Sequence, residues 1–297
     1  MLTNPISWFH IAKPPARALA KSKVSNALIA YILVSKFVDH LPFYRLAAMF
    51  KRQYNWQVDS QLMSHWLKSI CALLAPLYEV LKQQVRGSPY IQGDESPIKV
   101  LTNKKNKKGK KIAQGYMWAY AAVQLGLVVY DYQPGRSAKG PKAMLQNFKG
   151  YLQCNGCKVY NCIARLLQGI ILVVCWAHLR RKFYDALKSD SFRANKALIV
   201  IQKIYHIEAK MKEEAVSDYD QIAAIRQAKT KPLMEALKQW ADEESIKVQV
   251  GSPIAVAITN LNNQWHKLIA VLKDGRLRLD NYLVENSFRP LALFRAC

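Results

Sequence analysis

The chain has 297 residues, 51% of them hydrophobic, which excludes a disordered polypeptide and allows one large domain or two. Lysine and arginine total 44 against 20 acidic residues, so the formal net charge is +24 at pH 7. This charge indicates a polyanionic partner, with nucleic acid as the main candidate. A membrane-spanning protein is not expected, because the longest apolar run, from Gly169 to Ala177, is well short of the roughly 18–20 residues required.

The N-terminal tail, residues 1–24, lacks an apolar segment followed by a small-residue cleavage site. No signal peptide is therefore predicted, and we expect a cytoplasmic protein. Six unevenly spaced cysteines are typical of free thiols rather than of a secreted disulfide framework.

Residues 25–86 are predicted to form a helical, DNA-binding region. Apolar residues recur at helical spacing from Ser25 to Gln53, with Pro42 opening a second helix. After a polar turn at residues 55–59, Ser60 is the expected N-cap of a third helix. A separate amphipathic helix is expected at residues 72–85. The expected buried face of the third helix consists of Leu62, Trp66 and Leu67.

Two helices joined by a tight turn have the spacing of a DNA-reading helix-turn-helix, although any small helical hairpin has the same pattern. The basic charge of the chain favours the DNA reader. The residues expected to contact DNA from the third helix are Ser60, Gln61, Ser64, His65 and Lys68.

Gly87-Ser88-Pro89 ends this region and marks the start of a second one, residues 87–177, with the pattern of a mixed sheet. The last of its strands, 170–174, is uniformly apolar, so we expect it to be covered on both faces. A helical insertion is predicted at 178–252, and a final region at 253–297. The predicted elements are strands at 90–101, 116–123, 127–132, 151–154 and 170–174 and a short helix at 141–148.

A cluster of lysines stands between the first two predicted strands. It is interpreted as a solvated hairpin loop, which would attract phosphate groups even without a fixed structure. The lysines expected to contact DNA are Lys104, Lys105, Lys107 and Lys108.

Two acids are candidates for chemistry. Asp94 lies within an apolar strand, where a carboxylate is rare unless it is functional or paired. The alternative is an edge residue that faces solvent. Glu285 lies on the last helix, four residues after Asn281 and four before Arg289, so the three share one face. A surface ion pair between Glu285 and Arg289 is one interpretation. The other is that Glu285 and Asp94 bind a metal together.

Such a site would suit phosphoryl transfer on DNA. Two Mg²⁺ ions about 3.5–4 Å apart can polarise a scissile phosphate and activate its attacker, and they require anionic oxygen ligands. Three carboxylates usually supply these ligands. Here Asp94 and Glu285 are two, and Asn155 stands where a third is expected.

Several motifs, in order, resemble the IS66-type transposases. They are Leu33-Val34-Ser35-Lys36-Phe37-Val38-Asp39-His40-Leu41-Pro42-Phe43-Tyr44-Arg45, Ala75-Pro76-Leu77-Tyr78, Ile91-Gln92-Gly93-Asp94-Glu95-Ser96-Pro97, Leu152-Gln153-Cys154-Asn155-Gly156 with Val159-Tyr160-Asn161, Cys175-Trp176-Ala177-His178-Leu179-Arg180-Arg181-Lys182-Phe183, and Asp280-Asn281-Tyr282-Leu283-Val284-Glu285-Asn286 with Arg289-Pro290-Leu291-Ala292-Leu293.

The resemblance implies a bacterial, nucleoid-associated protein that acts on double-stranded DNA at transposon ends, as a monomer or a homo-oligomer. It implies an α/β fold, with an RNase H-like mixed sheet flanked by helices, an upstream helix-turn-helix and a helical insertion before the last acid. It also implies a two-Mg²⁺ site held by three acids, with Asp94 and Glu285 in this chain as the first and last.

The chain departs from the family pattern in three ways. Asn155 replaces the second catalytic Asp, which should slow the reaction by orders of magnitude. Tyr282 replaces a second Asn. We also expect a chain truncated at both ends, because the family has a cysteine-rich module upstream and continues past Arg295. A degenerate transposase with little or no activity is therefore predicted, and the alternative is a DNA-binding protein without catalysis that occupies transposon ends.

Two further patterns have alternative interpretations. Cys154-x-x-Cys157 and Cys175-x-x-His178 have the paired spacing of a structural zinc site, but the resemblance places non-ligands at the first pair, so zinc is not expected. Trp176 and His178 are interpreted as packing and helix-start residues. The basic run Arg180, Arg181 and Lys182 is interpreted as phosphate contacts or as a solvated helix face. Arg289 is also an expected DNA contact.

Overall fold

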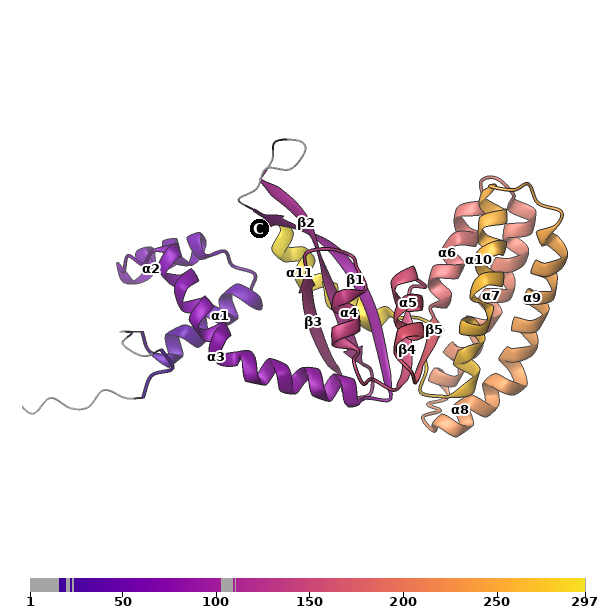
Figure 1. The fold of residues 1–297 in the computed structure, drawn as a ribbon, viewed down its shortest axis with the longest axis horizontal. Coiled ribbons are helices and arrows are strands. Elements are labelled where there is room, and N and C mark those ends of the chain that lie inside the picture. Colours follow the sequence, from indigo (N-terminus) through magenta and orange to yellow (C-terminus); the bar gives the residue numbers. More distant parts are fainter. Residues whose placement is uncertain (1–15, 20–21, 23, 103–108, 110, 297) are drawn as a thin grey trace, which may run out of the picture. The chain divides into compact units, whose positions relative to one another are not determined.

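The computed structural model describes residues 16–19, 22, 24–102, 109 and 111–296 (Figure 1). They divide into two compact units, one within Met1–Glu79 and Pro290–Cys297 and the other within Val80–Arg289. The predicted phosphate contacts Lys104, Lys105, Lys107 and Lys108 lie outside the described residues. No helix in the described ranges is long and apolar enough to cross a lipid bilayer.

The first unit is built from α1 (Asn26–Phe37), α2 (Phe43–Tyr54) and the first part of α3 (Ser60–Gly87). Ser25 caps α1 by accepting a hydrogen bond from the Leu28 N–H, and Asn55 ends α2 in the left-handed conformation that Asn tolerates. All three helices contribute large side chains to its core. Those from α2 and α3 are Leu46, Phe50, Met63, Trp66 and Ile70.

The third helix differs from the prediction in three respects. It is one continuous helix through Pro76 rather than two, because residues 69–71 contain no helix-breaking residue. Its N-cap is Asp59 rather than Ser60, since Asp59 Oδ1 accepts from the Gln61 N–H at 2.9 Å and the Asp59 carbonyl from the Met63 N–H at 3.1 Å. Leu62, expected in the core, is 44% exposed, because Met63 faces the core in its place.

The second unit contains a five-stranded sheet in the order β3-β2-β1-β4-β5. The central strand β1 pairs antiparallel with β2 and parallel with β4, and β4 pairs parallel with β5. The sheet is therefore mixed, which confirms the predicted fold class. The strands are β1 (Tyr90–Leu101), β2 (Ile112–Ala122), β3 (Leu127–Gln133), β4 (Gly150–Cys154) and β5 (Ile170–Val174).

Helices cover both faces of this sheet (Figure 1). Trp118 and Ala119 are successive residues of β2, so their side chains point to opposite faces. Trp118 packs edge to face against Tyr160 of α5 (Lys158–Leu166), next to α4 (Lys139–Met144), whereas Ala119 packs against Val284 of α11 (Tyr282–Ala296). The last helix therefore lies on the sheet face opposite α5.

A helical bundle packs beside β5 (Figure 1). It contains the predicted insertion, residues 178–252, and also the helical residues 253–273, which were assigned to the final region. An ion pair with a buried guanidinium fastens it, because Nε and one terminal nitrogen of Arg226 each lie 2.7 Å from a carboxylate oxygen of Glu208. The bundle comprises α6 (Trp176–Ala186), α7 (Ser191–Glu213), α8 (Tyr219–Ile225), a π-helical turn η1 (Arg226–Thr230), α9 (Lys231–Ser245), α10 (Pro253–Leu268) and a 3-10 turn η2 (Ile269–Lys273).

One local prediction about the sheet region was wrong, and one helix was missed. Strand β5 is an edge strand and is covered only in part, with Ile171 43% exposed. Its apolar run reflects the burial of Val173 and Val174 against the bundle. The helix α5 was not predicted, because it has only 9 residues and buries only Tyr160 and Ile163, which is too short a pattern to show helical periodicity.

Candidate functional site

The three residues singled out as a metal-binding set line one cavity in the second unit. Gln92 of β1 pairs with Gln153 of β4 in the parallel register, so Asp94 and Asn155 each stand two residues beyond that pair. Glu285 lies in the first turn of α11. Asp94, Asn155 and Glu285 border a cavity of about 360 Å³, together with His178 and Arg181 of α6 and Phe288 of α11.

Both ends of the Asn155 amide are hydrogen-bonded. Its Oδ1 accepts from the Cys157 N–H at 3.0 Å, and its Nδ2 donates to Asp94 Oδ1 at 3.0 Å. The backbone donor fixes which end of the amide is oxygen, so the N–H group faces Asp94. Gly156, with φ +82°, makes the turn that allows this arrangement.

The surroundings of the cavity disfavour the ionised form of its acids. Burial, with smaller contributions from the charges of Glu95 and Glu285, raises the pKa of Asp94 to about 7, although the hydrogen bond from the Glu95 N–H and the charge of Arg136 act in the opposite direction. Burial also raises the pKa of Glu285, and Arg181 opposes that shift. A cation in the cavity would favour the ionised form of both carboxylates.

The two neighbouring acids of β1 have different partners. Glu95, whose side chain is 1% exposed, accepts a hydrogen bond from Arg136 Nε at 3.0 Å and forms an ion pair with its guanidinium. Asp94 has no such cationic partner among the described ion pairs. Asp94 is therefore the acid of this pair that is available to a ligand in the cavity.

His178 was interpreted as a helix-start residue, and sequence reasoning missed its place in the cavity. Its Nδ1 lies 3.7 Å from Glu285 Oε1, whereas the described ion pairs include none between Glu285 and Arg289. Burial lowers the pKa of His178, which leaves a neutral imidazole able to bind a metal. The Cys175-x-x-His178 pair directly after a predicted strand was the signal that could have placed His178 in the cavity.

The four residues with the paired spacing of a zinc site, where zinc was not expected, are brought together only in part. Among the described residues, the group of ligand atoms within 4.8 Å of one another comprises Cys175, His178 and Glu285. Cys154 and Cys157 are not part of it. Trp176 is a packing residue, as predicted, fully buried and donating from Nε1 to the Leu268 carbonyl at 3.1 Å.

A buried polar network joins the start of α11 to the sheet. Gln92 Nε2 donates to Gln153 Oε1 at 2.9 Å and to the Asp280 carbonyl at 3.0 Å, and Gln92 Oε1 accepts from the Val284 N–H at 3.4 Å. Gln153 Nε2 donates to the Arg278 carbonyl at 2.7 Å. These bonds hold the segment before Glu285 against the ends of β1 and β4, and so position Glu285 beside Asp94.

The predicted DNA contacts of α3 lie in the first unit. Gln61, Ser64, His65 and Lys68 occupy positions i, i+3, i+4 and i+7 of the helix, on the side away from the buried Met63 and Trp66, and Ser60 is the first residue of the helix. This side is exposed to solvent, and only Ser60 is partly covered. Its exposed residues are Gln61, Ser64, His65 and Lys68.

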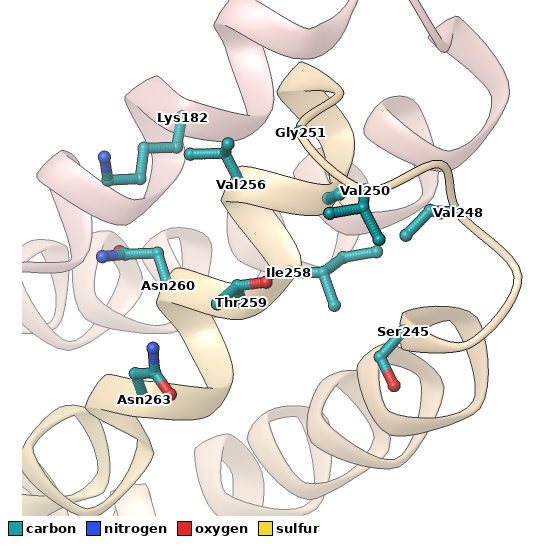
Figure 2. Close-up of a pocket in the computed structure, with 11 residues that line it drawn as sticks. Lys182, Ser245, Val248, Val250, Gly251, Val256, Ile258, Thr259, Asn260 and Asn263 are labelled. Atoms are coloured by element: carbon teal, nitrogen blue, oxygen red, sulfur yellow. The ribbon is translucent and has the colours of Figure 1, made fainter.

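The basic run of α6 is divided between two pockets. Arg180 and Arg181 line one beside α7, whereas Lys182 lines another next to α10 (Figure 2). Figure 2 shows Lys182 on α6 beside Val256 and Asn260. The three basic residues therefore do not all line one pocket. Arg289 is exposed on α11 and does not line the acid cavity.

Comparison with known proteins identifies the family. Residues 21–297 match the model of the family described as "Transposase IS66 family". Two proteins of Sinorhizobium fredii (strain NBRC 101917 / NGR234) are similar over 96% of the chain, the uncharacterized proteins y4jD, 31% identical, and y4qI, 29% identical. The chain covers 57% and 54% of their lengths, so it spans about half of these curated relatives. The chain belongs to the IS66 transposase family.

Proposed function

We propose that the cavity between β1, β4 and α11 is the reactive centre of a metal-dependent DNA transposase, and that Asn155 leaves it with little or no strand cleavage or transfer. The observation that carries the proposal is the meeting of Asp94, Asn155 and Glu285 in one cavity, although Asp94 and Glu285 stand on distant parts of the chain. The catalytic activity is proposed and not inferred from the family alone, because the chain covers only about half the length of its relatives.

The residues present suit one divalent cation better than two. Asp94 and Glu285 line the cavity and offer carboxylate oxygens, the ligands that Mg²⁺ or Mn²⁺ prefers, and His178 adds a ring nitrogen close to Glu285. A cation held there would polarise the scissile phosphate and lower the pKa of a bound water. The set is incomplete at the second position, where Asn155 presents an N–H group toward Asp94 and its oxygen is already hydrogen-bonded.

The remaining residues have roles in holding DNA. Arg181 lines the cavity and can bind a phosphate oxygen of the strand to be cut. Asp94, whose pKa is raised to about 7, is partly protonated near neutral pH without a cation and would release that proton when one binds. The exposed side of α3 would hold the duplex, with Gln61 and Lys68 among its contacts.

The proposal is tested by restoring the acid. The chain, Asn155→Asp and Asn155→Ala are incubated with end-labelled duplexes carrying the terminal repeats of the encoding element, with Mg²⁺ or Mn²⁺. We expect Asn155→Asp to cleave at least about 100-fold faster than the other two, since a lost bridging carboxylate costs several kcal/mol. Adding Glu285→Gln to Asn155→Asp should abolish the gain. Equal cleavage by the unaltered chain and Asn155→Asp would show that the predicted inactivity is wrong.

The second candidate is a DNA-binding protein that occupies transposon ends without cutting them. The exposed side of α3 favours it, because this side lies in a compact unit that does not contain the acid cavity. Binding of the same duplexes in EDTA, combined with inhibition of an intact IS66 transposase in a mixed reaction, supports this candidate. Cleavage by the unaltered chain excludes it.

A further inference from the structure

A second pocket lies next to the acid cavity. It has a volume of about 610 Å³, within the range of small-ligand sites, and it lies between α6, α7 and the first residue of α11. Arg181 lines both this pocket and the acid cavity. A DNA strand whose phosphate is held at Arg181 therefore has its neighbouring nucleotide at the mouth of the second pocket.

Three tyrosines from three helices line this pocket. Tyr184 of α6 and Tyr282 of α11 are 59% and 52% exposed, so about half of each residue remains accessible to a ligand. Tyr205 of α7 stands deeper, and burial raises its pKa, so its phenol stays neutral. Its Oη is buried and has no hydrogen-bond partner among the residues that the structure describes. Such a group is able to bond the edge of an incoming ligand.

The pocket carries positive charge, which favours an anionic ligand. Arg180 and Arg181 stand one helical turn before Tyr184, and the described lining contains no acidic residue. Leu198 and Ala177 supply apolar surface. Aromatic rings for stacking, guanidinium groups for phosphate and a hydrogen-bonding phenol are together the chemistry that recognises a nucleotide.

We propose that this pocket, which we call the tyrosine pocket (Tyr184, Tyr205, Tyr282, Arg180 and Arg181), binds an unpaired nucleotide of the DNA next to the phosphate to be cut. The inference rests on the proposed function for the position of that phosphate. A base still paired in a duplex has its faces covered by its neighbours, so only an unpaired or flipped base can present a face to Tyr184 or Tyr282. The pocket thus distinguishes DNA ends that carry unpaired bases from fully paired ends.

The test measures binding in EDTA, where no cleavage takes place. Fluorescence anisotropy compares a blunt duplex with the same duplex carrying a three-nucleotide single-stranded extension. We expect the chain to bind the extended duplex more tightly than the blunt one. Tyr282→Ala should weaken binding of the extended duplex about 5- to 150-fold, the range for loss of one stacked base, and leave the blunt duplex unchanged.

Matched variants separate stacking from folding and from charge. Tyr282→Phe keeps the ring and should bind the extended duplex as the unaltered chain does. Phe192→Ala removes an 81% exposed ring on α7 outside the pocket and should have no effect. Arg180→Ala should weaken binding of both duplexes but keep the preference for the extension, because a phosphate contact is not selective for unpaired bases.

Several outcomes overturn the inference. Equal affinity of the chain for the two duplexes, or an equal loss for both in Tyr282→Ala, would mean that the pocket contacts only the duplex backbone or another kind of partner. A Tyr282→Phe variant that is folded by circular dichroism but behaves like Tyr282→Ala would also exclude stacking. Because the assay contains no metal, failure of Asn155→Asp to cleave DNA leaves this result standing, and the two proposals fail separately.

Discussion

Asn155 donates a hydrogen bond from Nδ2 to Oδ1 of Asp94 at 3.0 Å, across the gap between two parallel strands. In an acid at position 155 the same contact would place two carboxylates side by side. Like charges at this distance repel unless a cation lies between them. The hydrogen bond therefore replaces what a metal ion would otherwise have to do, and it stabilises the cavity without one.

The first prediction concerns this contact. In EDTA, Asn155→Asp should lower the free energy of unfolding by about 1–3 kcal/mol, because a hydrogen bond is lost and a buried charge is added. Mg²⁺ or Mn²⁺ should then raise the melting temperature of this variant more than that of the unaltered chain. Asn155→Ala, which adds no acid, should not gain this response. Equal shifts in all three proteins would contradict the prediction.

The second prediction concerns pH. The pKa of Asp94 is about 7 in the folded chain against an ordinary value of 3.8, so the folded state holds this proton more tightly. The resulting stability is complete below about pH 4 and is lost as pH rises through 7. Asp94→Asn cannot lose it. In EDTA, its free energy of unfolding relative to the unaltered chain should rise between pH 4 and pH 8 by up to about 4 kcal/mol.

Urea unfolding at pH 4, 5.5 and 8 measures this difference. In Asp94→Asn the new amide oxygen can still accept the hydrogen bond from Asn155, so the variant changes the charge with little change in contacts. Parallel pH profiles for the two proteins would show that Asp94 does not titrate in this range.

The third prediction concerns the buried network beneath α11. Gln92→Leu leaves the Asp280 carbonyl and the Val284 N–H without their partner, and should cost about 2–3 kcal/mol of stability. It should also weaken Mn²⁺ binding, measured by calorimetry, because the start of the helix carrying Glu285 is released. Gln146→Leu, at an exposed position, is the control. Unchanged Mn²⁺ affinity in a destabilised Gln92→Leu would show that the network does not position Glu285.

The fourth prediction separates DNA contact from folding in the first unit. Lys68→Ala should weaken duplex binding at every sequence, reduce the slope of log affinity against log salt by about 1, and leave the melting temperature unchanged. Trp66→Ala removes a core side chain and should cost about 3–5 kcal/mol of stability. A Lys68→Ala variant with an unaltered salt slope would argue that this side of α3 does not face the phosphates.

The sequence was sufficient for much of this structure. Strands β1 and β5 have the predicted bounds, because turn residues such as Gly87 and Pro89 and long apolar runs delimit them. The positions of Asp94 and Glu285 in one cavity followed from the family resemblance rather than from their spacing, since nothing local relates two residues so far apart in the chain.

What was missed depends on tertiary contacts. A helix as short as α5 forms because Tyr160 packs against Trp118 of a distant strand, a contact that no local pattern records. His178 enters the cavity because β5 ends beside β4, which depends on sheet order. The direction of the Asn155 amide depends on the Cys157 N–H, and hence on the turn at Gly156. A glycine in the sequence allows this turn but does not require it.

The polar network at Gln92 and Gln153 also determines when the cavity can form. Its partners at residues 278–284 follow the whole helical bundle in the chain, so during synthesis on the ribosome the sheet is made long before its last acid. Until the bundle has folded and brought these residues back, the nascent chain has Asp94 but not Glu285 beside it. The order of translation thus makes the acid cavity one of the last features of the chain to form.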